Sequence, residues 1–184
     1  MRKFLLTAMV FLSMCYASFA QSNASATATQ NVELGLTNAL MIYFTSNGSA
    51  VGDLVTLQFN SVSDFQNGVQ SANQELKVLS NKHFNVAVKV SAYNFMYTSP
   101  SGVTSVSNQQ VEGVLDLKLT ANNTGGSVPV FSNFEDLKNT NQALLSNCNY
   151  GNNQTFSVKY RATPGFSFQP GVYYTDVIYT ATQY

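Results

Sequence analysis

Apolar and polar residues alternate with a period of two over much of the chain. In FNVAVKV, residues 84–90, the apolar side chains at the even positions face one way, while Asn85 and Lys89 face the other. The same alternation occurs in ELKVLS (75–80), VLDLKL (114–119) and FSVKYRA (156–162). Because successive side chains of a strand point to opposite faces, the pattern predicts half-buried strands.

Three further segments are predicted strands. NVELGL (31–36) and LVTLQF (54–59) alternate in the same way, whereas LMIYF (40–44) is continuously apolar. A continuous apolar run of this length is typical of a strand that is covered on both faces. Asn, Gly, Ser and Pro residues separate the segments and supply the turns between them.

The stretch from Ser132 to Asn147 departs from this alternation. Asn133 is suited to cap a helix, and the acidic Glu135 and Asp136 fall in its first turn, where the helix dipole favours negative charge. We therefore predict one short crossover helix at about residues 133–146. Short alternating strands without a strand–helix–strand rhythm predict an all-β fold, an immunoglobulin-like antiparallel β-sandwich, with a sheet closed on itself as the alternative.

The N-terminus has the composition of a secretory signal. Arg2 and Lys3 precede an apolar stretch, and small residues precede Gln21. We predict a signal peptide at 1–20, a flexible polar leader at 21–30 and a single β-sandwich domain at 31–184. The apolar stretch is shorter than the roughly 18 residues that a membrane span requires, so an uncleaved anchor is the weaker interpretation. The predicted location is the periplasm, the cell surface or the extracellular space.

Charge and cysteine content restrict the partners of the protein and the interactions that can stabilise it. Removal of the signal leaves seven basic and nine acidic residues, which are too few and too dispersed for a basic face, so we expect no nucleic-acid partner. Cys148 is then the only cysteine and has no disulfide partner. We expect packing and hydrogen bonds to hold the domain together.

Candidate catalytic chemistry is sparse. His83 is the only histidine; it and Cys148 lie far apart in the sequence, and no recognisable motif surrounds either residue. The acidic residues are spread along the chain, unlike a calcium loop, and one His with one Cys cannot supply a zinc site. We therefore expect a protein that is not an enzyme, with no catalytic residue, metal ligand or cofactor, and with no membrane span after signal removal.

Aromatic residues suggest one recognition site. YNFMYTSPSG, residues 93–102, combines Tyr93, Phe95 and Tyr97 with a turn that Pro100 and Gly102 favour. We take this segment as the candidate recognition loop of a secreted or cell-surface module that binds glycan or cell-wall polymer.

The last residues, QPGVYYTDVIYTATQY, carry a resemblance to known families. Gly171 is fourteenth from the end, and an alternating segment runs from it to the aromatic Tyr184. This ending resembles the C-terminal strand of chaperone–usher pilus subunits, and Tyr174, Thr175 and Asp176 are similar to the ending of spore coat U type domains and archaic pilins. The spacing of Gly171, Tyr173, Val177 and Tyr179 is also similar to the closing strand of WxL surface domains, with Tyr179 at the tryptophan position.

The resemblance implies an exported, non-catalytic structural subunit of bacterial fimbriae that assembles by β-strand complementation. It implies protein partners, namely further copies of the chain or a periplasmic chaperone. The implied assembly strand comprises Gly171, Tyr173, Tyr174, Asp176, Val177, Tyr179 and Tyr184. Val32, Leu34 and Leu36 form the candidate donor segment, with pairing inside their own domain as the alternative.

Overall fold

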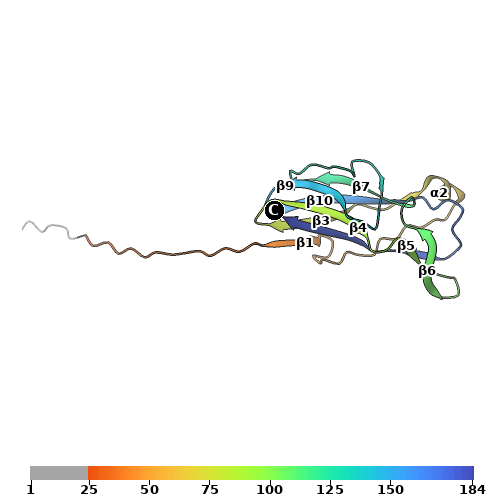
Figure 1. Ribbon diagram of the computed structural model, residues 1–184, viewed down its shortest axis with the longest axis horizontal. Coiled ribbons are helices and arrows are strands. Elements are labelled where there is room, and N and C mark those ends of the chain that lie inside the picture. Colours follow the sequence, from red (N-terminus) through yellow and green to blue (C-terminus); the bar gives the residue numbers. More distant parts are fainter. Residues whose placement is uncertain (1–24) are drawn as a thin grey trace, which may run out of the picture. The chain divides into compact units, whose positions relative to one another are not determined.

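The computed structural model describes residues 25–184 (Figure 1). The predicted signal peptide and the first residues of the predicted leader lie outside this range. Residues 25–36 have no secondary structure and are exposed, and the compact unit spans Thr37–Tyr184. Within residues 25–184, no helix has both the length and the apolar content of a membrane-crossing segment.

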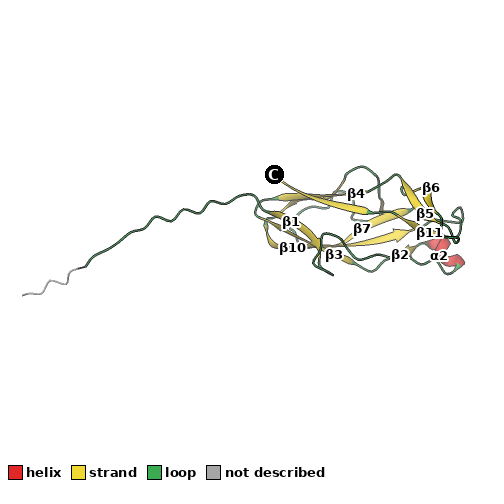
Figure 2. Ribbon diagram, turned by 90° about the horizontal axis from the view of Figure 1, so that it is seen from below, coloured by secondary structure: helices red, strands yellow, loops and turns green. Residues whose placement is uncertain are grey.

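Three antiparallel sheets make up the compact unit, as the all-β prediction requires (Figures 1 and 2). The first has the order β1 (Leu40–Phe44), β3 (Gln74–Ser80), β10 (Gly151–Ala162), β7 (Leu115–Asn122) and β8 (Glu135–Asp136), with β2 (Val69–Gln70) also paired to β10. The second has the order β12 (Val177–Gln183), β4 (Phe84–Val90) and β9 (Gln142–Cys148). The third, at the end that also carries the only helix of the described residues, has the order β11 (Val172–Tyr174), β5 (Asn94–Thr98) and β6 (Thr104–Gln110).

The first two sheets enclose one hydrophobic core, which makes the unit a β-sandwich. Its fully buried side chains come from the inward faces that the alternation predicts, among them Leu76, Val78, Phe84, Val86, Leu117 and Phe156. Burial of these apolar faces on both sides of the sandwich provides the main stabilisation of the fold. The strands predicted at 75–80, 84–90, 114–119 and 156–162 are thus confirmed; the one at 84–90 has the predicted ends, and the other three differ by one residue or more at an end.

The predicted helix at 133–146 is wrong in position. This region forms β8 and β9, and Leu144 and Leu145 are both buried in the core. The polar residues between β8 and β9 form a turn instead of a helix. The Gln142 side chain stabilises this turn, because it accepts a hydrogen bond from Lys138 N and donates one to Asp136 O. Tertiary packing of the leucines outweighs the local helix signals.

The short helix α2 (Val62–Asn67) begins at a capping box. Ser61 Oγ accepts a hydrogen bond from Asp64 N at 3.2 Å, and the Asp64 carboxylate accepts one from Ser61 N at 2.8 Å. These reciprocal bonds satisfy donors that a helix start leaves unpaired. The backbone N–H of Asn60, which also donates to the Asp64 carboxylate, and then that of Ser61 lower the pKa of Asp64, because both stabilise its charged form.

Two strand predictions near the N-terminus need correction. Residues 31–36 form no strand. Strand β1 is an edge strand rather than one covered on both faces, and Leu40 and Met41 are exposed. Continuous apolar character therefore does not mark burial here; it marks a surface strand with apolar side chains on both faces.

Candidate functional site

Strand β12 lies at the edge of the second sheet and is incompletely covered. It pairs with β4 from Val177 opposite Val90 to Gln183 opposite Phe84, and no strand of residues 25–184 pairs with its other edge. Its inward side chains Val177, Tyr179 and Ala181 are only half-buried. The inward side chains of neighbouring β4 are at most 1% exposed. The sandwich is therefore open along β12.

A second extended segment, Asp53–Asn60, borders the same opening. Its side chains alternate: Val55, Leu57 and Phe59 are half-buried, while Leu54 is 90% exposed. Residues 53–59 form no strand pairing, and their backbone groups make no hydrogen bond within the described part of the chain. The sequence correctly predicts the alternation at 54–59 but not the absence of a partner strand.

Between these two segments lies a groove of about 550 Å³. Strand β12 and the residue before it contribute Asp176 to Tyr179, and the extended segment contributes Asp53, Leu54, Val55 and Leu57. The floor includes Leu76, Leu115 and Tyr160 from the first sheet. The groove is thus mainly apolar and is bordered by two extended backbones that lack partners on this side.

Tyrosine and phenylalanine side chains of the groove lining pack against one another. The Phe44 and Tyr179 rings meet edge to face at 6.1 Å, and the hydroxyls of Tyr160 and Tyr179 lie 2.7 Å apart. Burial raises the pKa of Tyr160 to about 12 and raises that of Tyr179 well above its usual value. The pair therefore stays neutral at physiological pH and links the two sheets.

The chain enters the compact unit where β12 ends. Asn81 Oδ1 accepts a hydrogen bond from Ala39 N at 2.9 Å, and Gln183 Nε2 donates to Ala39 O at 2.8 Å. Residues 37–39 are therefore fixed beside the end of β12, without pairing to it as a strand.

The predicted C-terminal strand is in fact two strands in different sheets. Strand β11 pairs with β5, and β12 pairs with β4, with Thr175 and Asp176 between them. Ser91 and Asp176 fix the crossing, since Ser91 N donates to Asp176 O at 2.9 Å. The sequence could not show this crossing, because both strands alternate in the same way.

The implied assembly residues consequently separate in space. Asp176, Val177 and Tyr179 line the groove. Tyr173 instead belongs to the third sheet, where its ring lies 4.7 Å from that of Tyr97. Tyr174 is exposed on that sheet's other face, and Tyr184 is exposed beside His83, whose ring lies 6.2 Å away.

Gly171 is required where β11 approaches β5. Its φ is +151°, and a Cβ there would meet the Tyr97 ring and would lie 2.7 Å from Thr98 O. Tyr97 also donates a hydrogen bond through its hydroxyl to Pro170 O at 2.8 Å. Glycine at this position thus permits close backbone approach, as well as the bend.

Half of the candidate recognition segment is a strand. Residues 94–98 form β5, and the turn is restricted to the residues around Gly102. Phe95 is buried, Tyr97 is half-buried, and Tyr93 is exposed. The three residues therefore do not form one exposed loop.

His83 and Cys148 meet without forming a thiol and base pair. The His83 Nδ1 atom lies 3.1 Å from the backbone oxygen of Cys148, whereas the Cys148 Sγ accepts a hydrogen bond from Thr124 Oγ1 at 3.2 Å. Burial raises the pKa of the thiol, which disfavours the reactive thiolate. Cys148 is unpaired, as predicted, but it is buried.

A second hollow, about 440 Å³, lies over the first sheet and holds an ion pair. Arg161 donates to Asp116 Oδ2 through Nε at 2.9 Å, and its guanidinium carbon lies 4.5 Å from the centroid of the Phe134 ring. Both charges therefore have partners. The pKa of Asp116 is nevertheless raised, because burial outweighs the stabilising Arg161 charge.

Comparisons with known proteins leave the family open. No family model matches the chain, and no curated protein matches it. One similar solved structure is that of a family 123 glycoside hydrolase from Clostridium perfringens, with a TM-score of 0.30 and 16% sequence identity. The match covers 80% of this chain but 25% of that one. These values are too low to transfer an activity.

Proposed function

We propose that this protein is an exported, non-catalytic structural subunit, of the fimbria-like kind, that joins to other subunits by strand complementation. A strand supplied by another chain enters the groove between β12 and the Asp53–Asn60 segment. The single observation that carries the proposal is this groove, bordered by two extended backbones without strand partners on its side.

The physical case rests on unmade hydrogen bonds and uncovered apolar surface. An open sheet edge presents N–H and C=O groups that an added strand can pair. Val177, Tyr179 and Ala181 are half-buried, so an added strand with inward apolar side chains would complete their burial. Backbone hydrogen bonds to the added strand would supply affinity. The shape of the groove would determine which side chains that strand can carry.

The chain itself carries a segment with the required pattern. Val32, Leu34 and Leu36 are 78%, 81% and 87% exposed, and they alternate with Asn31, Glu33 and Gly35. A period of two places the three apolar side chains on one face of an extended strand. A second copy of this protein is therefore the proposed donor.

Deletion and charge variants test this mechanism. The purified protein should form concentration-dependent oligomers in light scattering coupled to size-exclusion chromatography, and filaments in electron microscopy. Deletion of residues 25–36 should leave monomers. Leu34→Asp, which places a charge on the apolar face, should weaken assembly at least tenfold, because a buried carboxylate is costly.

Asn31→Asp is the matched control. It introduces the same charge on the opposite face of the segment and should leave assembly nearly unchanged. Stable monomers of the unaltered protein, or assembly that survives deletion of residues 25–36, would contradict self-complementation. Assembly lost equally in both charge variants would indicate a net-charge effect instead.

A further inference from the structure

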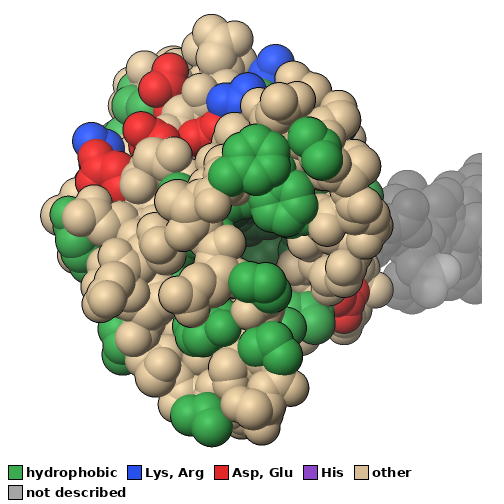
Figure 3. All heavy atoms as spheres, turned by 90° about the vertical axis from the view of Figure 1, so that its right-hand side faces the viewer, with side chains coloured by type: hydrophobic (Ala, Val, Ile, Leu, Met, Phe, Trp, Pro, Cys, Tyr) green, Lys and Arg blue, Asp and Glu red, His purple; other side chains and the backbone are tan. Residues whose placement is uncertain are grey.

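One end of the domain is formed by the third sheet, α2 and the 163–170 loop. The only charged side chain in these elements is that of Asp64, in the cap of α2. Residues 91–111 and 162–175 contain no Asp, Glu, Lys or Arg. Asp64 is the only charged residue of α2, and its carboxylate is bonded to the backbone of the cap. Figure 3 shows this end, with charged side chains at the periphery and hydrophobic side chains around a central hollow.

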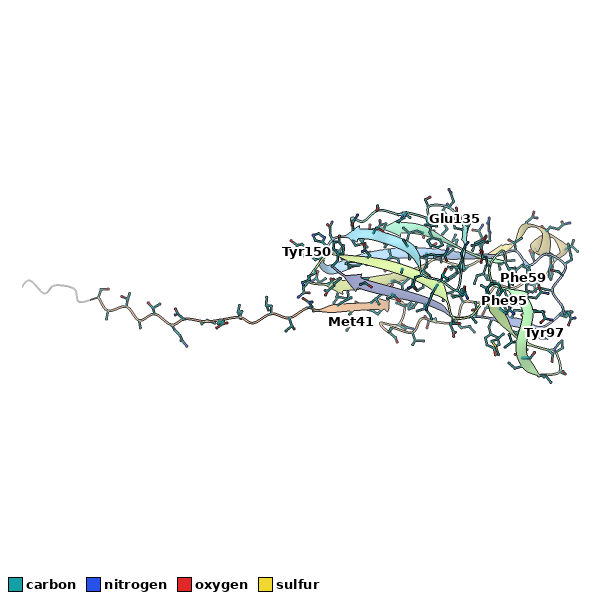
Figure 4. All side chains as sticks on the ribbon, viewed as in Figure 1. Met41, Phe59, Phe95, Tyr97, Glu135 and Tyr150 are labelled. Atoms are coloured by element: carbon teal, nitrogen blue, oxygen red, sulfur yellow. The ribbon has the colours of Figure 1, made fainter. Side chains whose placement is uncertain are left out.

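Aromatic rings form two groups at this end, one around Phe65 and one around Tyr173. Phe65 contacts Phe59 at 5.4 Å and stacks on Phe166 at 5.7 Å. Two residues further on, Phe168 lies 4.8 Å from the Tyr173 ring, which in turn lies 4.7 Å from Tyr97. Figure 4 shows Phe59, Phe95 and Tyr97 toward the same end of the domain.

One of these rings, Phe166, is exposed to solvent, Phe95 is buried, and the others are half-buried. The Phe166 side chain is 67% exposed although it stacks on Phe65, and Tyr97 is half-buried. Hydrophobic side chains that gather at one end of the surface, as Figure 3 shows here, are typical of a binding surface. The adjoining turn and strand β6 supply neutral hydrogen-bonding groups from exposed Ser, Thr, Asn and Gln residues.

We propose that this aromatic end binds a neutral glycan. Flat aromatic faces pack against the C–H faces of sugar rings, while neutral hydroxyl and amide groups bond to sugar hydroxyls. The absence of charge on residues 91–111 and 162–175 disfavours anionic or cationic polymers, which need opposite charge for recognition. Phe166 and Tyr97 are the proposed stacking residues. The site lies outside the strand-accepting groove, whose lining residues it does not share.

Affinity electrophoresis tests the proposal directly. The purified protein would be run through gels that contain neutral polysaccharides, namely xyloglucan, galactomannan and mixed-linkage β-glucan, and in separate gels heparin and polygalacturonate; sedimentation with cellulose and chitin extends the neutral set. We expect retardation or co-sedimentation by at least one neutral polymer. Phe166→Ala and Tyr97→Ala should each weaken that binding about tenfold, which corresponds to the loss of one stacked ring.

Two tyrosine variants are matched controls. Tyr150→Ala removes an exposed ring at the other end of the domain (Figure 4), and Tyr174→Ala removes one from the opposite face of the third sheet. Both should bind as the unaltered protein does. Phe166→Tyr, which keeps a ring, should retain binding and shows that the loss in Phe166→Ala is not misfolding.

Several results would overturn the glycan site. These are the absence of binding to every neutral polymer, equal or tighter binding to the charged polymers, and unchanged binding in Phe166→Ala and Tyr97→Ala. A change in self-association alone, with no polysaccharide bound, would assign the aromatic end to a contact between copies of the chain instead.

Discussion

At the scale of single residues, the hydroxyls of two tyrosines form a hydrogen bond inside the domain. Tyr160 and Tyr179 come from opposite sheets, and each hydroxyl has the other as its partner at 2.7 Å. Either side chain alone would carry an unsatisfied polar atom into the core. The pair thus lets two tyrosines line an apolar groove.

This pair makes stability sensitive to alkaline pH. An unfolded tyrosine ionises near pH 10, whereas the folded pKa of Tyr160 is raised to about 12. Below pH 10 both states hold the proton, and between pH 10 and 12 only the unfolded state loses it. Tyr160 alone should therefore lower the free energy of unfolding by about 1.4 kcal/mol per pH unit over that range, and Tyr179, whose pKa is also raised, adds to the fall.

Guanidinium unfolding at pH 9, 10, 11 and 12 measures this fall. Tyr160→Phe should be less stable at pH 9, because Tyr179 loses its hydrogen-bond partner, but it should show a shallower decline above pH 10. An equal slope in both proteins would show that other groups cause the decline.

Gly171 and Gly165 permit a matched comparison of glycine variants. Both have positive φ, but a Cβ at Gly165 meets nothing within 4 Å, whereas one at Gly171 meets Tyr97 and Thr98. Gly165→Ala should cost about 1 kcal/mol, from backbone strain alone. Gly171→Ala should cost about 1 to 3 kcal/mol more, through overpacking and because a φ of +151° is less accessible to alanine than the +63° of Gly165. Thermal unfolding of the two variants measures the difference, and equal costs would contradict close packing of β11 on β5.

At the scale of elements, the same alternating pattern leads to three different outcomes. Residues 84–90 become a central strand with fully buried inward side chains. Residues 54–59 become an extended segment without a ladder, and residues 31–36 form no element of the compact unit. The pattern indicates which side chains can share a face, but it does not show whether a partner strand exists.

The unpaired Asp53–Phe59 segment should exchange its amide hydrogens quickly. No backbone hydrogen bond protects these residues, whereas β4 is paired on both sides. Hydrogen exchange followed by mass spectrometry should show exchange within seconds at 53–59 and slow exchange at 84–90.

Addition of a peptide with the sequence of residues 25–36 should slow exchange at 53–59 and at 177–183, because it would pair with both edges. The same peptide with Leu34→Asp should not. Strong protection at 53–59 before the peptide is added would contradict an open groove.

At the scale of the whole molecule, the proposed activities occupy different parts of the compact unit. The groove lies along β12, and the uncharged aromatic end is built from the third sheet, α2 and the 163–170 loop. Their lining residues do not overlap, so loss of glycan binding in Phe166→Ala and loss of assembly in Leu34→Asp can be measured independently. If a subunit had both activities, each copy in an assembly would present a glycan-binding surface.

The wrongly placed helix shows that local sequence signals alone do not determine where a helix forms. Asn133, Glu135 and Asp136 satisfy the rules for a helix start, yet the region is drawn into β8 and β9 because Leu137, Leu144 and Leu145 are buried in the core. Conversely, the helix α2 begins at a capping box of Ser61 and Asp64, with Asp in place of the usual Glu, where no helix is predicted. Local rules identify candidate helix ends, and packing selects among them.

The sequence by itself determined the all-β class and the inward faces of the central strands. These properties follow from the alternation of side chains, which depends only on residues that are close together in the sequence. Only the tertiary structure decided that the final segment divides between two sheets, that β12 has an open edge and that Asp53–Asn60 faces it across a groove. The physical reason is that strand pairing joins residues distant in the chain, and an unmade pairing leaves no mark in the residues themselves.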